Sequence, residues 1–238
     1  MVKISGVVLA AGAGSRLGAL GQRHSKPMVP IAGRPLIDWV IERLQAGGVD
    51  ALVIVRHAGD RALGAHLGER WPGAAIAEQA ERLGIADALC RGLPLLGDVP
   101  AYLACACDSL FAATDIAALI AAGGDGAAVV GVLDLGAAAT TARSAVRCDG
   151  ERVVDIVEKP APGTAPSGLV AAPLYWLPRA VDPYLATAAT QGGERYVSVA
   201  LAAYARAGGV VRALRLCERL EVTTAADVAA VSAALCRC

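Results

Sequence analysis

The chain has 238 residues, enough for one α/β domain with a substantial core or for two small domains. Its 22 basic and 22 acidic residues cancel, so no basic excess indicates nucleic acid as a partner and no polybasic run indicates a membrane surface. Hydrophobic residues make up 55% of the sequence, yet the apolar stretch at 117–133 is broken by Asp125 and its neighbouring glycines, which argues against a spanning helix.

The amino terminus, MVKISGVVLAAGAG, has a very short apolar run that leads into a glycine loop. This pattern is typical of a first buried strand rather than of a signal peptide. The seven cysteines are an odd number without the spacing of a disulfide framework, and the C-x-C pairs Cys105/Cys107 and Cys236/Cys238 match no common zinc pattern. We therefore expect a cytoplasmic protein with free thiols.

The first part of the chain alternates strands and helices. The hydrophobic pattern predicts strands at 4–11, 51–55, 74–78, 101–107 and 127–133, and helices at 35–46, 60–70, 86–95 and 115–122. Pro35 suits the first turn of its helix, and Gly47-Gly48 ends it. This alternation predicts an α/β fold with a Rossmann-like, mostly parallel sheet and helices on both faces.

The remainder of the chain is richer in strands. Extended segments are expected at 144–148, 153–157 and 169–177, and two helices then surround the strand pair 210–214 and 220–222. We expect these segments to extend the same sheet within a single domain, 1–238. Because such sheets bind ligands beyond the carboxyl ends of their strands, functional residues should directly follow strands.

A glycine-rich loop, L-A-A-G-A-G-S-R-L-G at 9–18, follows the first strand. Glycines let backbone N–H groups approach a phosphate or a base without an intervening Cβ. The glycines at 12, 14 and 18 are one residue too far apart for the G-x-G-x-x-G of NAD-binding oxidoreductases, and the second strand ends in Val55-Arg56 instead of an acidic residue. A Walker loop is also excluded, because no Gly-Lys-Ser/Thr follows.

Arg16 and, ten residues later, Lys26 complete a longer pattern with S-K-P-M-V-P-I-A-G-R-P-L-I. Residues 7–37 resemble the signature of the sugar-phosphate nucleotidyltransferases, the NDP-sugar pyrophosphorylase-like family. The resemblance implies that Arg16 and Lys26 act on the reacting phosphates, as a planar fork and a point charge respectively. It also implies that the loop binds the nucleotide through Leu9, Ala10, Ala11, Gly12 and Gly14.

Gln79 and Gly84 follow the third strand in Q-A-E-R-L-G, with the spacing of the family's Q-x-x-P-x-G. The resemblance implies that both contact the base, and a glutamine amide can both donate to and accept from a base edge. Arg82 stands where the family usually has proline.

Asp108 ends the fourth strand, where the family holds Mg²⁺ with an aspartate, although Cys107 replaces the usual glycine before it. Near the end of the chain, R-L-E-V-T-T-A-A-D-V resembles the family's W-x-D-V-x-T-P-E-D-L. Glu221 then takes the second metal position, and Thr223 stands where some relatives carry a ligating asparagine. We expect Mg²⁺ at Asp108 and Glu221, with Thr223 as the alternative, because a longer glutamate can still reach a hard cation.

Glu158-Lys159-Pro160 follows the strand at 153–157. The resemblance implies that Glu158 holds sugar hydroxyls, that Lys159 holds the acceptor phosphate, and that Gly168 belongs to the same acceptor site. The asparagine that the family places before its Y-x-F strand has no counterpart in Ser167-Gly168-Leu169. The nucleotide-binding half then covers about 1–135 and the acceptor-binding half about 136–238.

These residues predict transfer of a nucleoside monophosphate from an NTP to a sugar 1-phosphate, with NTP·Mg²⁺ bound before the acceptor. The absent asparagine leaves a non-sugar acceptor open: inositol phosphate, phosphocholine or a phosphonate. A non-catalytic nucleotide-sensing homologue is the other alternative, and the presence of Arg16, Lys26 and Asp108 argues against it. The base is not determined by the sequence, and a homo-oligomer is left open.

Overall fold

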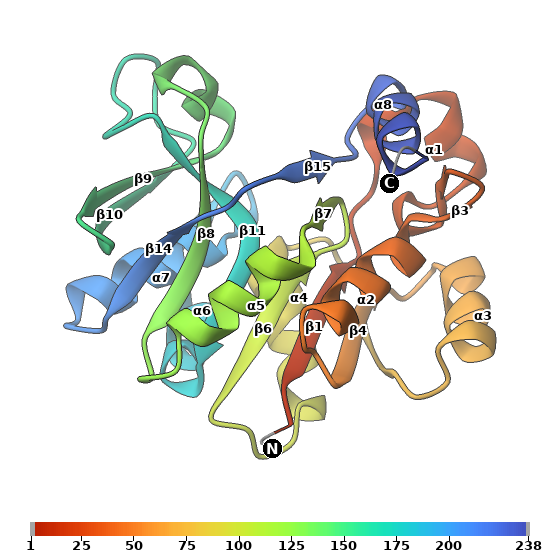
Figure 1. Cartoon of the computed structure of the whole chain (residues 1–238), viewed down its shortest axis with the longest axis horizontal. Helices are drawn as coiled ribbons and strands as arrows, with labels where there is room; N and C mark the ends of the chain where they lie inside the picture. Colours follow the sequence, from red (N-terminus) through yellow and green to blue (C-terminus); the bar gives the residue numbers. More distant parts are fainter. Residues whose placement is uncertain (1–2, 237–238) are drawn as a thin grey trace.

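The protein is described by a computed structural model for residues 3–236, apart from the side chains of residues 137–139. Its centre is a nine-stranded sheet with the order β5-β4-β1-β6-β11-β8-β14-β10-β9 (Figure 1). The strands are β1 Ser5–Ala10, β4 Ala51–His57, β5 Ala75–Gln79, β6 Ala101–Ala106, β8 Ala128–Asp134, β9 Ser144–Asp149, β10 Arg152–Glu158, β11 Leu169–Pro178 and β14 Val211–Arg215.

Seven of these nine strands point the same way. β5, β4, β1 and β6 are parallel neighbours, and β8 and β14 form another parallel pair. β11 lies antiparallel between β6 and β8, and β10 lies antiparallel between β14 and β9, so both run against the other seven. The predicted α/β fold is confirmed, and the second half of the chain does extend the same sheet.

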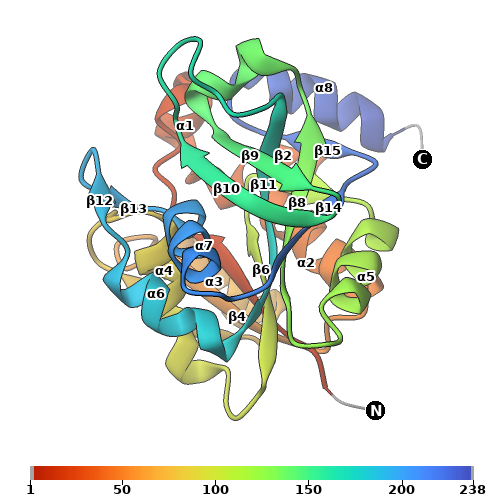
Figure 2. The ribbon, with the colours of Figure 1, turned by 90° about the vertical axis from the view of Figure 1, so that its left-hand side faces the viewer.

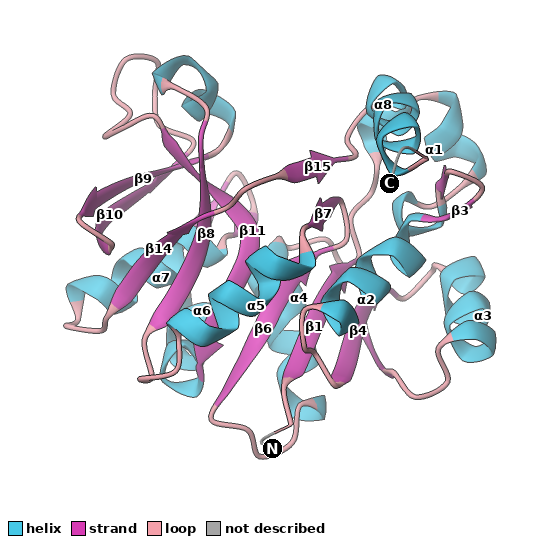
Figure 3. Ribbon diagram, in the orientation of Figure 1, coloured by secondary structure: helices cyan, strands magenta, loops and turns pink. Residues whose placement is uncertain are grey.

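Helices cover both faces of the sheet (Figures 2 and 3). One layer contains α2 Leu36–Ala46, α3 Arg61–Arg70, α5 Ala113–Ala122 and α8 Ala225–Leu235, and the other contains α4 Ile85–Gly92, α6 Asp182–Thr187 and α7 Val197–Arg206. In α2, Leu36, Ile37, Val40, Ile41 and Leu44 recur at helical spacing, and all are buried against the sheet. Each layer therefore encloses its own apolar core.

Every predicted strand and helix is present, with ends that differ from the predicted ends by at most three residues. Short elements were not predicted, since a turn of helix or a two-residue strand leaves no periodic signal. They are α1 Ala19–Arg23, β2 Pro30–Ile31, β3 Arg34–Pro35, β7 Ser109–Phe111, the six-residue helix α6, β12 Thr190–Gln191, β13 Glu194–Arg195 and the 3-10 turns, while β15 Arg219–Glu221 matches the last predicted strand.

The pairing of β7 with β15 returns the end of the chain to the sheet's functional edge. Glu221 lies opposite Ser109 in this ribbon, and the backbone N–H of Val222 donates to the carbonyl of Asp108 over 2.8 Å. Residues that are distant in sequence thus meet beyond the carboxyl end of β6.

Within residues 3–236, no helix combines the length and the apolar character that crossing a bilayer requires. The cysteines in this range, Cys90, Cys105, Cys107, Cys148, Cys217 and Cys236, are all free, as expected, and Cys238 lies outside the described residues.

Candidate active site

A cavity of about 440 Å³ opens beyond the carboxyl ends of β1, β5 and β6. The predicted residues that line it are Leu9, Ala10, Ala11, Gly12, Gly14, Arg16, Lys26, Gln79, Gly84 and Asp108. Its wall also contains Arg82, Glu194, Tyr196 and Thr223. Parallel strands bring their carboxyl ends to one edge, so residues far apart in sequence converge here.

The glycine loop turns tightly enough to bring Arg16 and Lys26 to this cavity. Gly14 has a φ of 65°, a left-handed conformation, and a Cβ on it would lie 3.0 Å from the Cβ of Lys26. Leu17 N–H closes the turn on the Gly14 carbonyl over 3.0 Å. No described residue pairs with the exposed side chain of Arg16, which leaves its guanidinium available to an anion.

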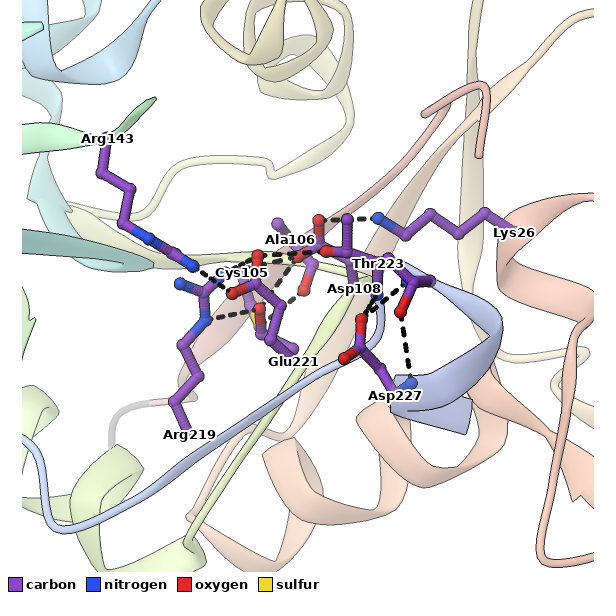
Figure 4. A network of polar contacts seen from close by, with 11 residues as sticks. Lys26, Cys105, Ala106, Asp108, Arg143, Arg219, Glu221, Thr223 and Asp227 are labelled. Carbon is purple, nitrogen blue, oxygen red and sulfur yellow. Dashed lines mark hydrogen bonds and ion pairs between the residues drawn. The ribbon is translucent and has the colours of Figure 1, made fainter. Parts of the chain in front are cut away.

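Lys26 and Asp108 form an ion pair with 2.9 Å between Nζ and Oδ2 (Figure 4). The Asp108 carboxylate also accepts from Ser109 Oγ over 2.9 Å, and Arg219 Nη2 lies 3.9 Å from it. Burial opposes ionisation of Asp108, but Lys26, Arg219 and the hydrogen bonds outweigh it and hold the pKa of this carboxyl below its usual value. The cavity therefore keeps an ionised carboxylate.

Glu221 belongs to the same polar network but is not part of the cavity wall. Its Oε2 accepts from Arg143 Nη2 over 2.8 Å, and its Oε1 lies 3.2 Å from Arg219 Nη2. Thr223, which does line the cavity, donates its hydroxyl to Oε1 over 3.2 Å. Figure 4 shows Lys26 approaching Asp108 from one side while Arg143 and Arg219 approach Glu221 from the other.

Gln79 is the last residue of β5, Gly84 directly precedes α4, and both line the cavity. The Gln79 side chain is buried, and its Nε2 donates to the Gly84 carbonyl over 3.2 Å. Gly84 has a φ of 95°, and a Cβ there would come within 2.4 Å of the Arg195 carbonyl, so this position requires glycine. Arg82 reaches back across the cavity edge and donates its Nε to the Ala11 carbonyl over 3.1 Å.

Glu158 and Lys159 lie beside the cavity, not in its wall. Glu158 Oε2 accepts hydrogen bonds from Ser144 and, over 2.6 Å, from Ser198. Both contacts lie within residues 136–238, which are expected to bind the acceptor, and this carboxylate therefore already has hydroxyl partners.

Lys159 lies over the ring of Tyr196, with Nζ 4.5 Å from the ring centroid, and donates to the Tyr196 hydroxyl. This hydrogen bond outweighs partial burial and raises the pKa of Lys159. Tyr196 in turn donates to Glu194 over 2.6 Å. Since Tyr196 and Glu194 line the cavity, they connect Lys159 to it.

Gly168 lies at the start of β11, away from the cavity wall. A Cβ on Gly168 would come within 2.9 Å of the Gly136 Cα, and its carbonyl accepts from Leu135 N–H over 3.1 Å. Close packing against the end of β8 is sufficient to explain a glycine here.

Several residues of the network were not assigned from sequence. Two of them could have been noticed in the sequence. Arg82 stands where the family usually has proline, and Arg219 stands where it usually has tryptophan. No sequence motif contains Arg143, Glu194 or Tyr196. Only the three-dimensional structure shows that they belong to the site.

Comparison with known proteins places this geometry in context. A family model described as "Nucleotidyl transferase" matches residues 5–209. The chain is 46% identical over 54 residues to CMP-5'-(3-aminopropyl)phosphonate synthase from Streptomyces rubellomurinus, covering 23% of this chain and 9% of that protein. It is 37% identical over 98 residues to N-acetylmuramate alpha-1-phosphate uridylyltransferase from Neisseria meningitidis serogroup B, covering 40% and 42% respectively. Both matches thus span less than half of the relative's length.

Among solved structures, that of a UDP-glucose pyrophosphorylase complexed with UDP-glucose is similar, with a TM-score of 0.86 over 99% of each chain. The sequence identity is 18%, so this likeness concerns the fold.

Proposed function

The chain belongs to the nucleotidyl transferase family, and we propose that it transfers a nucleoside monophosphate from an NTP to a sugar 1-phosphate, releasing pyrophosphate. One observation carries the proposal: Arg16, Lys26 and Asp108 all line a single cavity bounded by the glycine loop. A non-catalytic nucleotide-sensing homologue would have no need to keep both cations and the carboxylate around one space.

For this reaction the protein must position the two substrates and offset the negative charge of the phosphates. A phosphate oxygen of the acceptor attacks the α-phosphorus in line, the bond to the bridging oxygen breaks, and pyrophosphate leaves. A phosphate dianion is already nucleophilic, so no general base is required. Lys26 and Arg16 offset the charge that develops on the phosphates, and Lys26 exchanges Asp108 for a phosphate oxygen as the NTP binds.

Magnesium fits this site as a companion of the nucleotide. Asp108 offers an ionised carboxylate in the cavity, and Mg²⁺ commonly combines one or two carboxylates with substrate phosphates and water. Among the described residues, no three His, Cys, Asp or Glu side chains gather into a metal cluster, so substrate phosphate oxygens and water would complete the coordination of an ion held by Asp108. The ion would supply positive charge to the triphosphate.

For the second metal position we keep Glu221 as the proposal and Thr223 as the alternative. Glu221 would have to release Arg143 or Arg219 first, whereas Thr223 already lines the cavity. Comparing Glu221→Gln with Thr223→Ala distinguishes them: the true ligand's variant needs more Mg²⁺ for half-maximal activity.

A second candidate keeps the reaction and changes the acceptor. The carboxylate that sugar hydroxyls would approach, Glu158, is already engaged by the hydroxyls of Ser144 and Ser198. This favours an acceptor without a sugar ring, such as a phosphonate, and one relative is a phosphonate synthase by name.

The test is to incubate the protein with each NTP, Mg²⁺ and a panel of sugar 1-phosphates, phosphonates, phosphocholine and inositol phosphate, and to follow pyrophosphate release. We expect release that requires both substrates and that Asp108→Asn removes. Nucleotide binding without release from any pair would support the sensing alternative instead.

A further inference from the structure

The buried amide of Gln79 is oriented by its surroundings. Gln79 is 3% exposed, and its Nε2 donates both to the Gly84 carbonyl, over 3.2 Å, and to Asp87 Oδ2, over 2.9 Å. An amide nitrogen carries two hydrogens, so both are used within the protein. Oε1 has no partner among the described residues, yet it is not one of the buried unpartnered atoms, which leaves it as the atom that can meet a ligand.

Rotating the Gln79 amide by half a turn would be energetically unfavourable. The reversed orientation would place Oε1 against the Asp87 carboxylate and the Gly84 carbonyl, and both of those groups accept hydrogen bonds. Asp87 is itself fixed: it is 2% exposed, and Arg195 Nη2 donates to its Oδ1 over 3.1 Å.

A fixed acceptor has a defined consequence for base recognition. Uracil and cytosine present inverted patterns at positions 3 and 4, since uracil has a donor N–H and then a carbonyl, whereas cytosine has an acceptor nitrogen and then an amine. Guanine and adenine are inverted in the same way at positions 1 and 6. An acceptor held at one place suits one member of each pair and opposes the other, while an amide free to turn can serve both.

We propose that Asp87 is a specificity-determining positioning residue, which holds Gln79 as a hydrogen-bond acceptor and thereby makes the site discriminate between UTP and CTP. The assignment rests on the proposed function, in which the Gln79 end of the cavity receives the base. Asp87 acts through Gln79 and touches no substrate itself.

The test compares Asp87→Asn with Arg91→Gln. Asparagine keeps the size of the side chain but can present either a donor or an acceptor, so only the Gly84 carbonyl still opposes the reversed orientation of the Gln79 amide. Arg91 is 54% exposed and contacts Asp87 without contacting Gln79, which makes its variant the matched control. The measurements are kcat/KM for UTP and CTP with the best acceptor, and calorimetric Kd values for both nucleotides without acceptor.

We expect the ratio between the two nucleotides to move toward one by about tenfold in Asp87→Asn, the cost of one mismatched buried hydrogen bond, and to stay unchanged in Arg91→Gln. A purely structural role would weaken both nucleotides equally and leave the ratio intact, which would overturn the proposal. A wild-type protein that accepts UTP and CTP equally well would also overturn it, whether or not the variant folds. If the wild type releases no pyrophosphate from any pair, the proposed function fails, and the binding ratio still tests Asp87 separately.

Discussion

The side of the site proposed to bind the nucleotide and the side proposed to bind the acceptor are constructed differently. Arg16, Lys26 and Asp108 surround an open cavity, and the first of these has no partner among the described residues. Glu158 and Lys159 instead lie beside the cavity, held by serine hydroxyls and by Tyr196. On the proposed nucleotide side, the charged groups already line the cavity and only the Lys26–Asp108 pair has to open. On the proposed acceptor side, both Glu158 and Lys159 must exchange internal partners for the acceptor.

The largest effect should follow from removing the charge of Asp108. Asp108→Asn keeps the shape of the side chain but loses the proposed Mg²⁺ carboxylate and the partner of Lys26, so we expect turnover to disappear while the melting temperature stays near that of the wild type. Pyrophosphate release measures turnover, and thermal unfolding measures the melting temperature. Wild-type kcat at saturating Mg²⁺ would contradict the metal assignment.

Lys26→Ala tests the nucleotide side next. Loss of one preorganised charge at the reacting phosphates should lower kcat by roughly 10²–10³. Arg23→Ala removes a positive charge from the exposed surface of α1, away from the cavity wall, and serves as the control. A Lys26 variant that loses only NTP affinity and keeps its full kcat would show that the lysine binds the ground state alone.

A smaller and different effect is expected from Lys159→Ala on the acceptor side. If Lys159 holds the acceptor phosphate, the variant should raise the acceptor KM by about tenfold, the size of one charge-assisted hydrogen bond, and should raise the NTP KM much less. Steady-state kinetics with each substrate varied in turn measures this, with exposed Arg147→Ala as the control. Equal increases in the acceptor KM and the NTP KM would contradict the assignment of Lys159 to the acceptor side.

The same difference between the two sides explains which residues of the site could be predicted from the sequence. That the residues of the proposed nucleotide side line one cavity was predictable, because the glycine loop is contiguous with β1 and because Gln79 and Asp108 lie at or just beyond the ends of parallel strands. Tyr196 and Glu194 reach the cavity through tertiary contacts, including Arg195 N–H donating to the Leu83 carbonyl over 2.8 Å, which no local pattern encodes.

The polar network around Glu221 is the clearest example of contacts that the sequence alone does not predict. Arg219 meets Ser109 across 110 positions of sequence, because β15 pairs with β7. Strands were predicted from periodicity, but the antiparallel placement of β11 between β6 and β8 depends on long-range pairing that periodicity does not specify.

We propose that the nucleotide side is organised before its ligand binds, apart from the Lys26–Asp108 pair, and that the acceptor side is not. Isothermal titration calorimetry tests it directly, with an α,β-methylene analogue of the preferred NTP, Mg²⁺ and the acceptor. We expect the analogue to bind the free protein and the acceptor to bind measurably only once the analogue is present. Equal acceptor affinity with and without the nucleotide analogue would contradict it.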